Sequence, residues 1–263
     1  MADCARPFLK AEVSDSWLDA RLAPDKLRLL NDKHDGTPMT DITPTARSRV
    51  KRHHERGAYD LDTIAAILDA AFLCHVGYVI DGQPYVTPTS YWREDDVLYW
   101  HGSSASRMLR TLETGIACCF TVTIVDGLVL ARSAFNHSVN YRSVMLFGRA
   151  SVVEETAEKV RQLELFTQRM YPGRWTELRP VTAQEIKATT VLSMRIEDGS
   201  AKVRSGPPKD DAPDYGWPVW AGVIPVQSTA LNAQPDPAQK VEATEREYLH
   251  ELSHIGLHAV PSR

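Results

Sequence analysis

A serine-rich turn that leads to an arginine is the first segment whose residue types could do chemistry. In VLYWHGSSASRMLR, residues 97–110, a strand-like run ends at Trp100 and His101, and a helix carrying Arg107 follows. Free backbone N–H groups at a helix start attract anions, and an arginine can give a phosphate two parallel hydrogen bonds. The segment could therefore bind a phosphate. Serine-rich helix starts are more often ordinary caps, however, and the P-loop pattern GxxxxGK[ST] is absent.

A second polar cluster precedes an apolar strand-like run. The segment HSVNYRSVMLFG, residues 137–148, brings histidine, asparagine, tyrosine, arginine and serine to the start of that strand. Such groups often hydrogen-bond a loop, but they could also bind the edge of a planar ring. If a reaction needs an acid, His101 or His137 is the better candidate, because histidine titrates near neutral pH. For both, a structural hydrogen bond is the simpler role, and no catalytic residue is assigned.

A literal HExxH motif lies at His250, Glu251 and His254. On a helix the two histidines would share one face, as in zinc proteases, and His258 extends the row. A third ligand at a suitable spacing is missing. Three histidines at i, i+4 and i+8 also span about 12 Å of helix, which is too far for one ion. We therefore predict no metal site and expect an ordinary exposed helix.

The composition limits the class of protein. The 263 residues carry 30 Lys and Arg against 34 Asp and Glu, a net charge of −4, which argues against a dedicated nucleic-acid-binding protein. No apolar run approaches the roughly 18 residues of a membrane helix, and the first residues lack the apolar core of a secretory signal. The four cysteines are scattered, without a CxxC pair. We expect a cytoplasmic protein with reduced cysteines that contacts neither nucleic acid nor membrane.

Short strand-like runs separated by turns dominate the middle of the chain. A helix with Asp60 as its N-cap is expected over LDTIAAILDAA, and hairpins are expected at two DG pairs, Asp81–Gly82 and Asp126–Gly127. Residues 154–171 have the pattern of an amphipathic helix, and TAQEIKA adds a shorter one. Six or seven strands with few helices predict a mainly β protein, an antiparallel barrel with helical decoration.

The chain divides into three expected parts. Residues 1–44 are expected to form a mobile extension with a short helix near Trp17–Leu30, residues 45–230 the barrel domain, and residues 231–263 a linker with a C-terminal helix. The basic run RSRVKRHHER, residues 47–56, is expected to be a solvated arm. Contact with an anionic ligand or a partner subunit is its alternative role.

The order of these segments resembles the flavin-nucleotide-binding branch of the pyridoxamine 5′-phosphate oxidase-like superfamily, which includes the nitroimidazole-resistance (Nim) type proteins. The resemblance covers about residues 45–228, and HGxxxSR and HSxNYRSVxxFG are its most specific parts. It implies an FMN-binding split β-barrel, which is a Greek-key antiparallel six-stranded barrel with peripheral helices. It also implies a homodimer that holds FMN between its subunits.

The resemblance further implies which residues contact FMN. Ser106 and Arg107 would hold the phosphate, and Ser143 stands where the oxidase has a glutamine beside the flavin. The oxidase has a lysine at the position of Met108, so Arg110 or Arg142 would have to replace that cation. The complete set of predicted cofactor-binding residues is Thr87, Pro88, Thr89, Ser90, Tyr91, Trp100, His101, Ser106, Arg107, Arg142, Ser143 and Trp220.

The function implied by the resemblance is an FMN-dependent oxidoreductase. It would reduce a small aromatic or nitro-containing molecule with NAD(P)H or another donor, and the cofactor would carry most of the chemistry. The arginine motif that binds pyridoxamine phosphate has no clear counterpart, which disfavours vitamin B6 oxidation. A non-catalytic flavin carrier or sensor is an alternative, since the nucleotide-binding pattern GxGxxG is absent. Two further alternatives are a deazaflavin in place of FMN, and a haem-binding or haem-degrading split barrel with an axial ligand among His250, His254 and His258.

Overall fold

The computed structural model describes residues 41–244, 246, 248 and 252–259. The helix expected near Trp17–Leu30 therefore lies outside the described residues. Among the described helices, none has the length and apolar character needed to cross a membrane.

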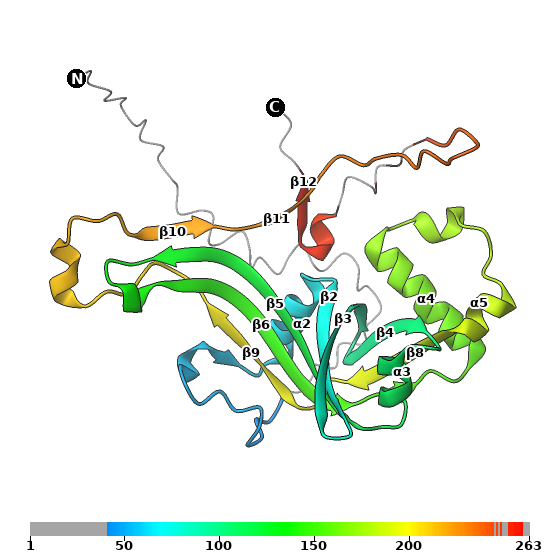
Figure 1. The fold of residues 1–263 in the computed structure, drawn as a ribbon, viewed down its shortest axis with the longest axis horizontal. Helices are drawn as coiled ribbons and strands as arrows, with labels where there is room; N and C mark the ends of the chain where they lie inside the picture. Colours follow the sequence, from blue (N-terminus) through cyan, green and yellow to red (C-terminus); the bar gives the residue numbers. More distant parts are fainter. Residues whose placement is uncertain (1–40, 245, 247, 249–251, 260–263) are drawn as a thin grey trace. The chain divides into compact units, whose positions relative to one another are not determined.

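One antiparallel sheet organises the described chain (Figure 1). Its strand order is β1-β9-β6-β5-β2-β3-β4-β8-β7, with β10 pairing to β5, and the sheet curls into a half-barrel. The predicted mainly β split barrel is thus confirmed, although the sheet holds ten strands rather than six. The strands are β1 (Gly57–Ala58), β2 (Leu73–Ile80), β3 (Gln83–Glu94), β4 (Val97–Ser103), β5 (Ala117–Leu130), β6 (Ser138–Arg149), β7 (Ser151–Val152), β8 (Thr189–Arg195), β9 (Gly199–Arg204) and β10 (Gly222–Pro225).

The helices begin where the local sequence predicts caps. The Asp60 carboxylate accepts a hydrogen bond of 2.8 Å from the Thr63 N–H at the start of the first helix. Thr182 and Glu185 form a reciprocal capping box at the start of the last. These α-helices are α2 (Leu61–Asp69), α3 (Arg107–Leu112), α4 (Thr156–Met170) and α5 (Ala183–Ala188). Single 3-10 turns are η3 (His54–Arg56), η4 (Ala134–Asn136), η5 (Arg174–Glu177) and η6 (Ala212–Gly216).

The two DG pairs have different structures. Asp81 and Gly82 both have positive φ, 49° and 78°, and they join β2 to β3 in the predicted hairpin. The second predicted hairpin is wrong, because Asp126 and Gly127 lie inside the continuous strand β5, at a bulge. A Cβ on Gly127 would lie 2.9 Å from Val223 Cγ1 of the neighbouring β10. This glycine therefore permits a close strand approach instead of a turn.

Two apolar clusters fill the two sides of the sheet. The larger one lies on the inner face, where α2 packs against side chains of β2, β5 and β6, including Val76, Phe120 and Leu146. The smaller cluster is built on Trp92 and Val191 and packs beneath α4. The second cluster lies on the outer face, because residues on β3 alternate between faces.

Both ends of the predicted domain differ from expectation. Ile42, placed in the extension, is buried, and its N–H donates a 3.0 Å hydrogen bond to the Tyr59 carbonyl. Near the other end, the expected C-terminal helix is absent at the described residues: Ser253–Ile255 form a 3-10 turn (η8), and β12 (Leu257–Ala259) pairs in parallel with β11 (Ser228–Ala230). Gly256 breaks the helical path with φ of 79°, where the chain passes the carbonyl of α2's last turn too closely for a Cβ.

Candidate functional site

Arg107 projects over an aromatic pair on the β2–β3 hairpin. Its guanidinium carbon lies 4.6 Å from the centre of the Tyr85 ring. Tyr85 stacks on Tyr78, with ring centroids 5.6 Å apart, and the Tyr78 hydroxyl lies 3.1 Å from Thr87 Oγ1. Arg107 is exposed and has no carboxylate partner within the part of the chain that the structure describes. The hairpin thus holds the Arg107 guanidinium in place, and its positive charge is available to bind an anion.

The backbone N–H groups of the serine turn before Arg107 are bonded within the chain, at Ser104, Ala105 and Ser106. The Ser106 N–H donates to the Ser103 carbonyl at 2.8 Å, but the Ser106 side chain makes no capping bond with α3. Arg110 folds back over the turn, with its Nε donating to the Ser104 carbonyl at 2.9 Å. The Ser106 hydroxyl, the first N–H groups of α3 and the Arg110 guanidinium therefore lie at this turn, and Arg107 extends from it over Tyr85. This is a donor set that fits a phosphate.

Arg142 does not join this group. Its guanidinium forms two hydrogen bonds of 2.9 Å with the carboxylate of Asp126, so its charge is already neutralised. Of the two cations expected to replace the oxidase's lysine, only Arg110 lies beside the serine turn. Ser143, next to Arg142, has its Oγ 3.3 Å from the Lys202 carbonyl on β9, and Trp220 lies before β10 with 63% of its surface exposed.

Two predicted site residues belong to the inner core. Tyr91 and Trp100 are fully buried and lie opposite each other on β3 and β4. The Tyr91 hydroxyl donates to the Leu68 carbonyl, and burial raises the pKa of that hydroxyl. Both rings contact Phe120, with centroids 5.1 and 5.9 Å away. The side chains of Tyr91 and Trp100 hold β3 and β4 against the core. A ligand on the outer face could contact only the backbone of these two residues.

His101 lies on the opposite face of β4 and meets α4. Its ring centroid is 4.7 Å from that of Phe166 and 5.7 Å from that of Trp92. Nδ1 is buried without a hydrogen-bond partner, and burial lowers the pKa of the imidazole, which is therefore neutral at pH 7. A buried ring nitrogen without a partner is uncommon in a folded protein. His137, the other candidate acid, is exposed, and its Nδ1 lies 2.8 Å from the Ser133 carbonyl.

Several side chains on the outer face of β2, β3, β5 and β6 are exposed, away from the end of β3 where α4 covers Trp92. Strand pairing places these side chains on one face, which we call the open face. Of the predicted residues, Pro88, Ser90 and Ser143 lie on this face, whereas Thr87 and Thr89 point inward. The open face consists of Leu73, His75, Val79, Val86, Pro88, Ser90, Thr121, Thr123, Ser143 and Met145.

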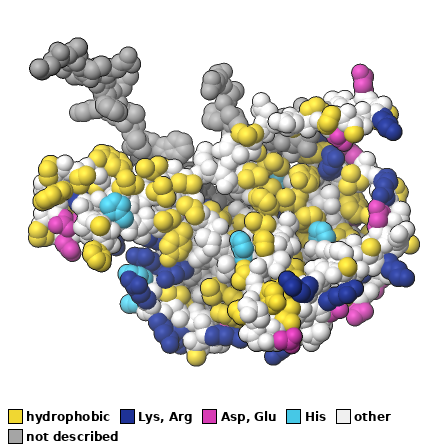
Figure 2. Space-filling view, viewed as in Figure 1, with side chains coloured by type: hydrophobic (Ala, Val, Ile, Leu, Met, Phe, Trp, Pro, Cys, Tyr) yellow, Lys and Arg dark blue, Asp and Glu magenta, His cyan; other side chains and the backbone are white. Residues whose placement is uncertain are grey.

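A second apolar surface lies on the part of β5 and β6 that extends beyond the inner core, together with β10. Figure 1 shows these strands as a long arm, and Figure 2 shows hydrophobic side chains gathered over it. We call this surface the arm. Its exposed apolar side chains are Leu128, Phe135, Val139, Trp217, Trp220 and Ile224. Exposed apolar groups at this density are typical of a surface that another molecule covers.

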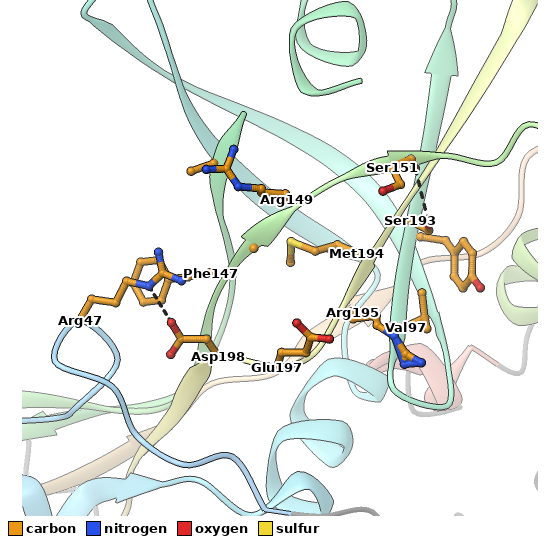
Figure 3. Close-up of a pocket in the computed structure, with 13 residues that line it drawn as sticks. Arg47, Val97, Phe147, Arg149, Ser151, Ser193, Met194, Arg195, Glu197 and Asp198 are labelled. Carbon is orange, nitrogen blue, oxygen red and sulfur yellow. Dashed lines mark hydrogen bonds and ion pairs between the residues drawn. The ribbon is translucent and has the colours of Figure 1, made fainter. Parts of the chain in front are cut away.

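A cleft of about 600 Å³ opens between the end of β6 and the strand β8 (Figure 3). Arg47 lies over the Phe147 ring and pairs with Asp198 at 2.6 Å, and Arg195 pairs with Asp96 at 2.9 Å. None of the predicted site residues lines this cleft. Because most of its charges are already paired within the chain, the cleft is a weaker candidate than the turn at Arg107.

The sequence analysis did not predict that Tyr78 and Tyr85 hold the Arg107 guanidinium, although the hairpin sequence contains the information. The Asp81–Gly82 turn sets the hairpin register, and that register places the two tyrosines opposite each other. Lys202 was missed as well. It stands beside Ser143 only because β9 pairs with β6, and the two strands are far apart in the chain.

The solved structures that resemble this chain include two proteins that are also similar to it in sequence. The flavocytochrome Anf3 from Azotobacter vinelandii is 48% identical, with a TM-score of 0.76, and the match covers 79% of this chain and 97% of that chain. An FAD- and haem-binding protein from Mycobacterium smegmatis is 33% identical, with a TM-score of 0.71, over 75% of this chain and 97% of that chain. No curated protein matches the chain.

A family model agrees with the fold and with these similarities. The model described as pyridoxamine 5′-phosphate oxidase matches residues 60–203, which is more than half of the chain and includes the serine turn, the open face and α4. The chain therefore belongs to the pyridoxamine 5′-phosphate oxidase family.

Proposed function

We propose that this chain is a flavin-dependent oxidoreductase that binds haem as a second redox group. The observation that carries the proposal is the cation of Arg107, which has no carboxylate partner in the described chain and is held over Tyr85, next to a Ser106 hydroxyl that makes no cap. The similarity to a flavocytochrome and to an FAD- and haem-binding protein, each matched over 97% of its length, supports both cofactors. When bound, a flavin accepts a hydride and passes on one or two electrons, and haem iron exchanges single electrons.

The phosphate group of the flavin would lie at the serine turn. Arg107 and Arg110 supply positive charge there, and Ser106 supplies a hydroxyl that makes no cap. FMN is the form implied by the sequence motifs, whereas the mycobacterial relative binds FAD. Both forms contain riboflavin 5′-phosphate, which is the part that this turn would hold. The mass of the chromophore released from the protein distinguishes the two.

His101 would support the site by packing and not by contact with the ligand. Its ring packs against Phe166, and its Nδ1 is buried. Burial lowers the pKa of this histidine, so it adds no positive charge at pH 7.

We further propose a homodimer with the flavin between the subunits. The arm supports this proposal, since it carries exposed tryptophan and aliphatic side chains well away from the inner core. Covering these side chains with a second copy would remove them from water, which is favourable by roughly 25 cal/mol per Å² of apolar surface. Sedimentation of the purified chain measures its mass directly, and a monomer at micromolar concentration would contradict the dimer.

The test of the cofactor proposal is the absorption spectrum of the purified chain with Arg107→Ala as the main variant. The wild type is expected to show oxidised-flavin bands and a haem Soret band. Arg107→Ala removes charged hydrogen bonds worth about 1.5–3 kcal/mol, so flavin affinity should fall roughly 10- to 100-fold. Arg179→Ala, at an exposed arginine paired with Glu185, should leave flavin affinity unchanged. Unchanged affinity in Arg107→Ala contradicts the phosphate role, and a wild type that takes up no flavin contradicts the proposed function.

A further inference from the structure

His75 stands in the middle of the open face. It lies on β2, opposite Pro88 of β3 on one side and Thr121 of β5 on the other. Its side chain is exposed, and neither ring nitrogen has a partner among the residues that the structure describes. An imidazole nitrogen is the commonest protein ligand of haem iron. His75 is therefore a free ligand of the right type at the centre of an uncovered surface.

The other described histidines are less suited to that role. Three of them have a ring nitrogen within 3.2 Å of an oxygen acceptor: His53, His137 and His254. His101 is packed beneath α4, and His54 lies outside the sheet in the basic run. Of the tail ligands considered from the sequence, His254 has its Nε2 2.6 Å from the Arg169 carbonyl, and the side chains of His250 and His258 lie outside the described part of the chain.

The surface around His75 is apolar and belongs to a sheet. Leu73 and Val79 lie on the same strand, Val86 lies on the neighbouring β3, and Met145 lies on β6, beyond β5. All four side chains are largely exposed. A flat macrocycle that is apolar except at one edge would cover these side chains and shield them from water.

A group of cations borders the same face at β9. Lys202 stands opposite Ser143, and Arg204 stands opposite Tyr141. Arg204 is only 9% exposed and donates to Asn140 Oδ1, yet no carboxylate pairs with it in the described chain. The nearby charge of Arg56 lowers its pKa further than burial does alone.

The positive charges of Lys202, Arg204 and Arg56 are not fully balanced by carboxylates of the described chain. Among the residues that the structure describes, Glu55 is the one carboxylate within 4 Å of Arg56, at 3.6 Å. A buried cation without an anionic partner is costly, so this edge of the open face fits a carboxylate or phosphate of a bound molecule. The strand order β2-β5-β6-β9 puts Lys202 three strands from His75, roughly 14 Å along the sheet.

We propose that the open face is the haem site, with His75 as an axial ligand of the iron and with Lys202 and Arg204 as partners of the propionates. The inference rests on the haem binding proposed above, and it assigns that binding to particular residues. Haem supplies an apolar plane, a metal that takes an imidazole and two carboxylates on one edge. The open face supplies the matching groups in that arrangement: apolar side chains, a free imidazole and a cationic border.

The test is haem binding by the full chain with His75→Ala. Titration with haemin is expected to show a haem affinity at least tenfold lower than in the wild type. The Soret band and the electron paramagnetic resonance spectrum should change as the iron loses a nitrogen ligand, and added imidazole should restore the wild-type spectrum. His137→Ala, at an exposed histidine away from this face, is the matched control and should keep both affinity and spectrum. The circular dichroism spectrum and the urea midpoint should stay the same in both variants, which shows that the fold is intact.

A second variant tests the cationic border. Lys202→Met should lower haem affinity about tenfold through loss of a charged hydrogen bond, without changing the ligands of the iron. Lys209→Met, outside the border, should have no effect. Normal haem uptake with a wild-type spectrum in His75→Ala overturns the assignment of His75 and leaves the proposed function standing. A wild-type chain that binds flavin but no haem overturns both this inference and the haem part of the proposed function.

Discussion

The outer face of the sheet is covered at one end and open at the other. At the covered end, α4 lays Leu163 and Phe166 over Trp92, which is 1% exposed. At the open end, Val86 lies on the same face of the same strand β3, six residues earlier, and is 67% exposed. Both ends carry large apolar side chains, so hydrophobicity alone does not explain which of them is covered.

The two ends differ in how their polar groups are satisfied. At the covered end the Trp92 Nε1–H donates to Gln162 at 2.7 Å, and Gln162 donates in turn to Glu94 and Glu158 at 2.9 Å. At the open end His75 and Lys202 have no side-chain partner in the described chain. The chain itself supplies the partners of Trp92 at the covered end, although the nearby His101 Nδ1 has none, and we infer that a ligand supplies the partners at the open end.

The largest expected effect comes from matched substitutions at the two ends. Trp92→Ala should lower the free energy of unfolding by about 3–5 kcal/mol, because it leaves a cavity under α4. Val86→Ala should change it by no more than about 0.5 kcal/mol in the absence of ligand. Urea denaturation followed by circular dichroism measures both values. Equal losses of unfolding free energy in Trp92→Ala and Val86→Ala would contradict the conclusion that one end of the face is covered and the other is open.

An effect of intermediate size is expected in the arm, where β10 passes close to Gly127 of β5. In Gly127→Ala the new methyl group would lie 2.9 Å from Val223 Cγ1 and 3.1 Å from the Ile224 carbonyl, so β10 must shift. We expect a loss of about 1–3 kcal/mol in the free energy of unfolding. Hydrogen exchange at residues 222–225 should become faster.

Gly216→Ala is the control for the arm, since nothing lies within 4 Å of the added Cβ. It should leave both stability and exchange near the wild-type values. Unchanged exchange at β10 in Gly127→Ala would mean that this strand is not held by its close approach to the bulge.

The smallest expected effect is a pH dependence at the covered end. Hydrogen bonds from Arg161 hold the pKa of Glu94 below its ordinary value near 4.5, and Gln162 adds to this effect against the opposing influence of burial. A carboxyl group whose pKa is lower in the folded state stabilises the fold fully above its unfolded pKa. That stabilisation is lost as the pH falls through the folded value. The stability of the wild type should therefore decline below about pH 4.5.

Glu94→Gln should flatten part of this decline, by at most about 1 kcal/mol because the pair is partly exposed to water. Urea denaturation at pH 7 and at several values below 4.5 measures the difference between variant and wild type. A decline of the same size in Glu94→Gln would show that other carboxylates govern the acid sensitivity.

Much of the local structure could be predicted from neighbouring residues. The cap at Asp60, the turn at Asp81–Gly82, the helix over 154–171 and the serine turn before Arg107 each depend on groups within a few positions of one another. Such interactions repeat with the period of a helix or the geometry of a tight turn, so a single segment contains the whole signal. The family and its split barrel follow from the order of these segments.

Only the tertiary structure decided which candidate residues face a ligand. Tyr91 and Trp100 turn into the core, Arg142 is neutralised by Asp126, and the second DG pair stays in a strand because β10 arrives from nearly one hundred residues later. The open face with its cationic border is likewise assembled from β2, β5, β6 and β9 by strand pairing over long separations. The sequence alone determined which local elements form. Long-range pairing decided which of their faces is buried and which charges are paired, because burial and charge compensation depend on residues that meet only when the chain has folded.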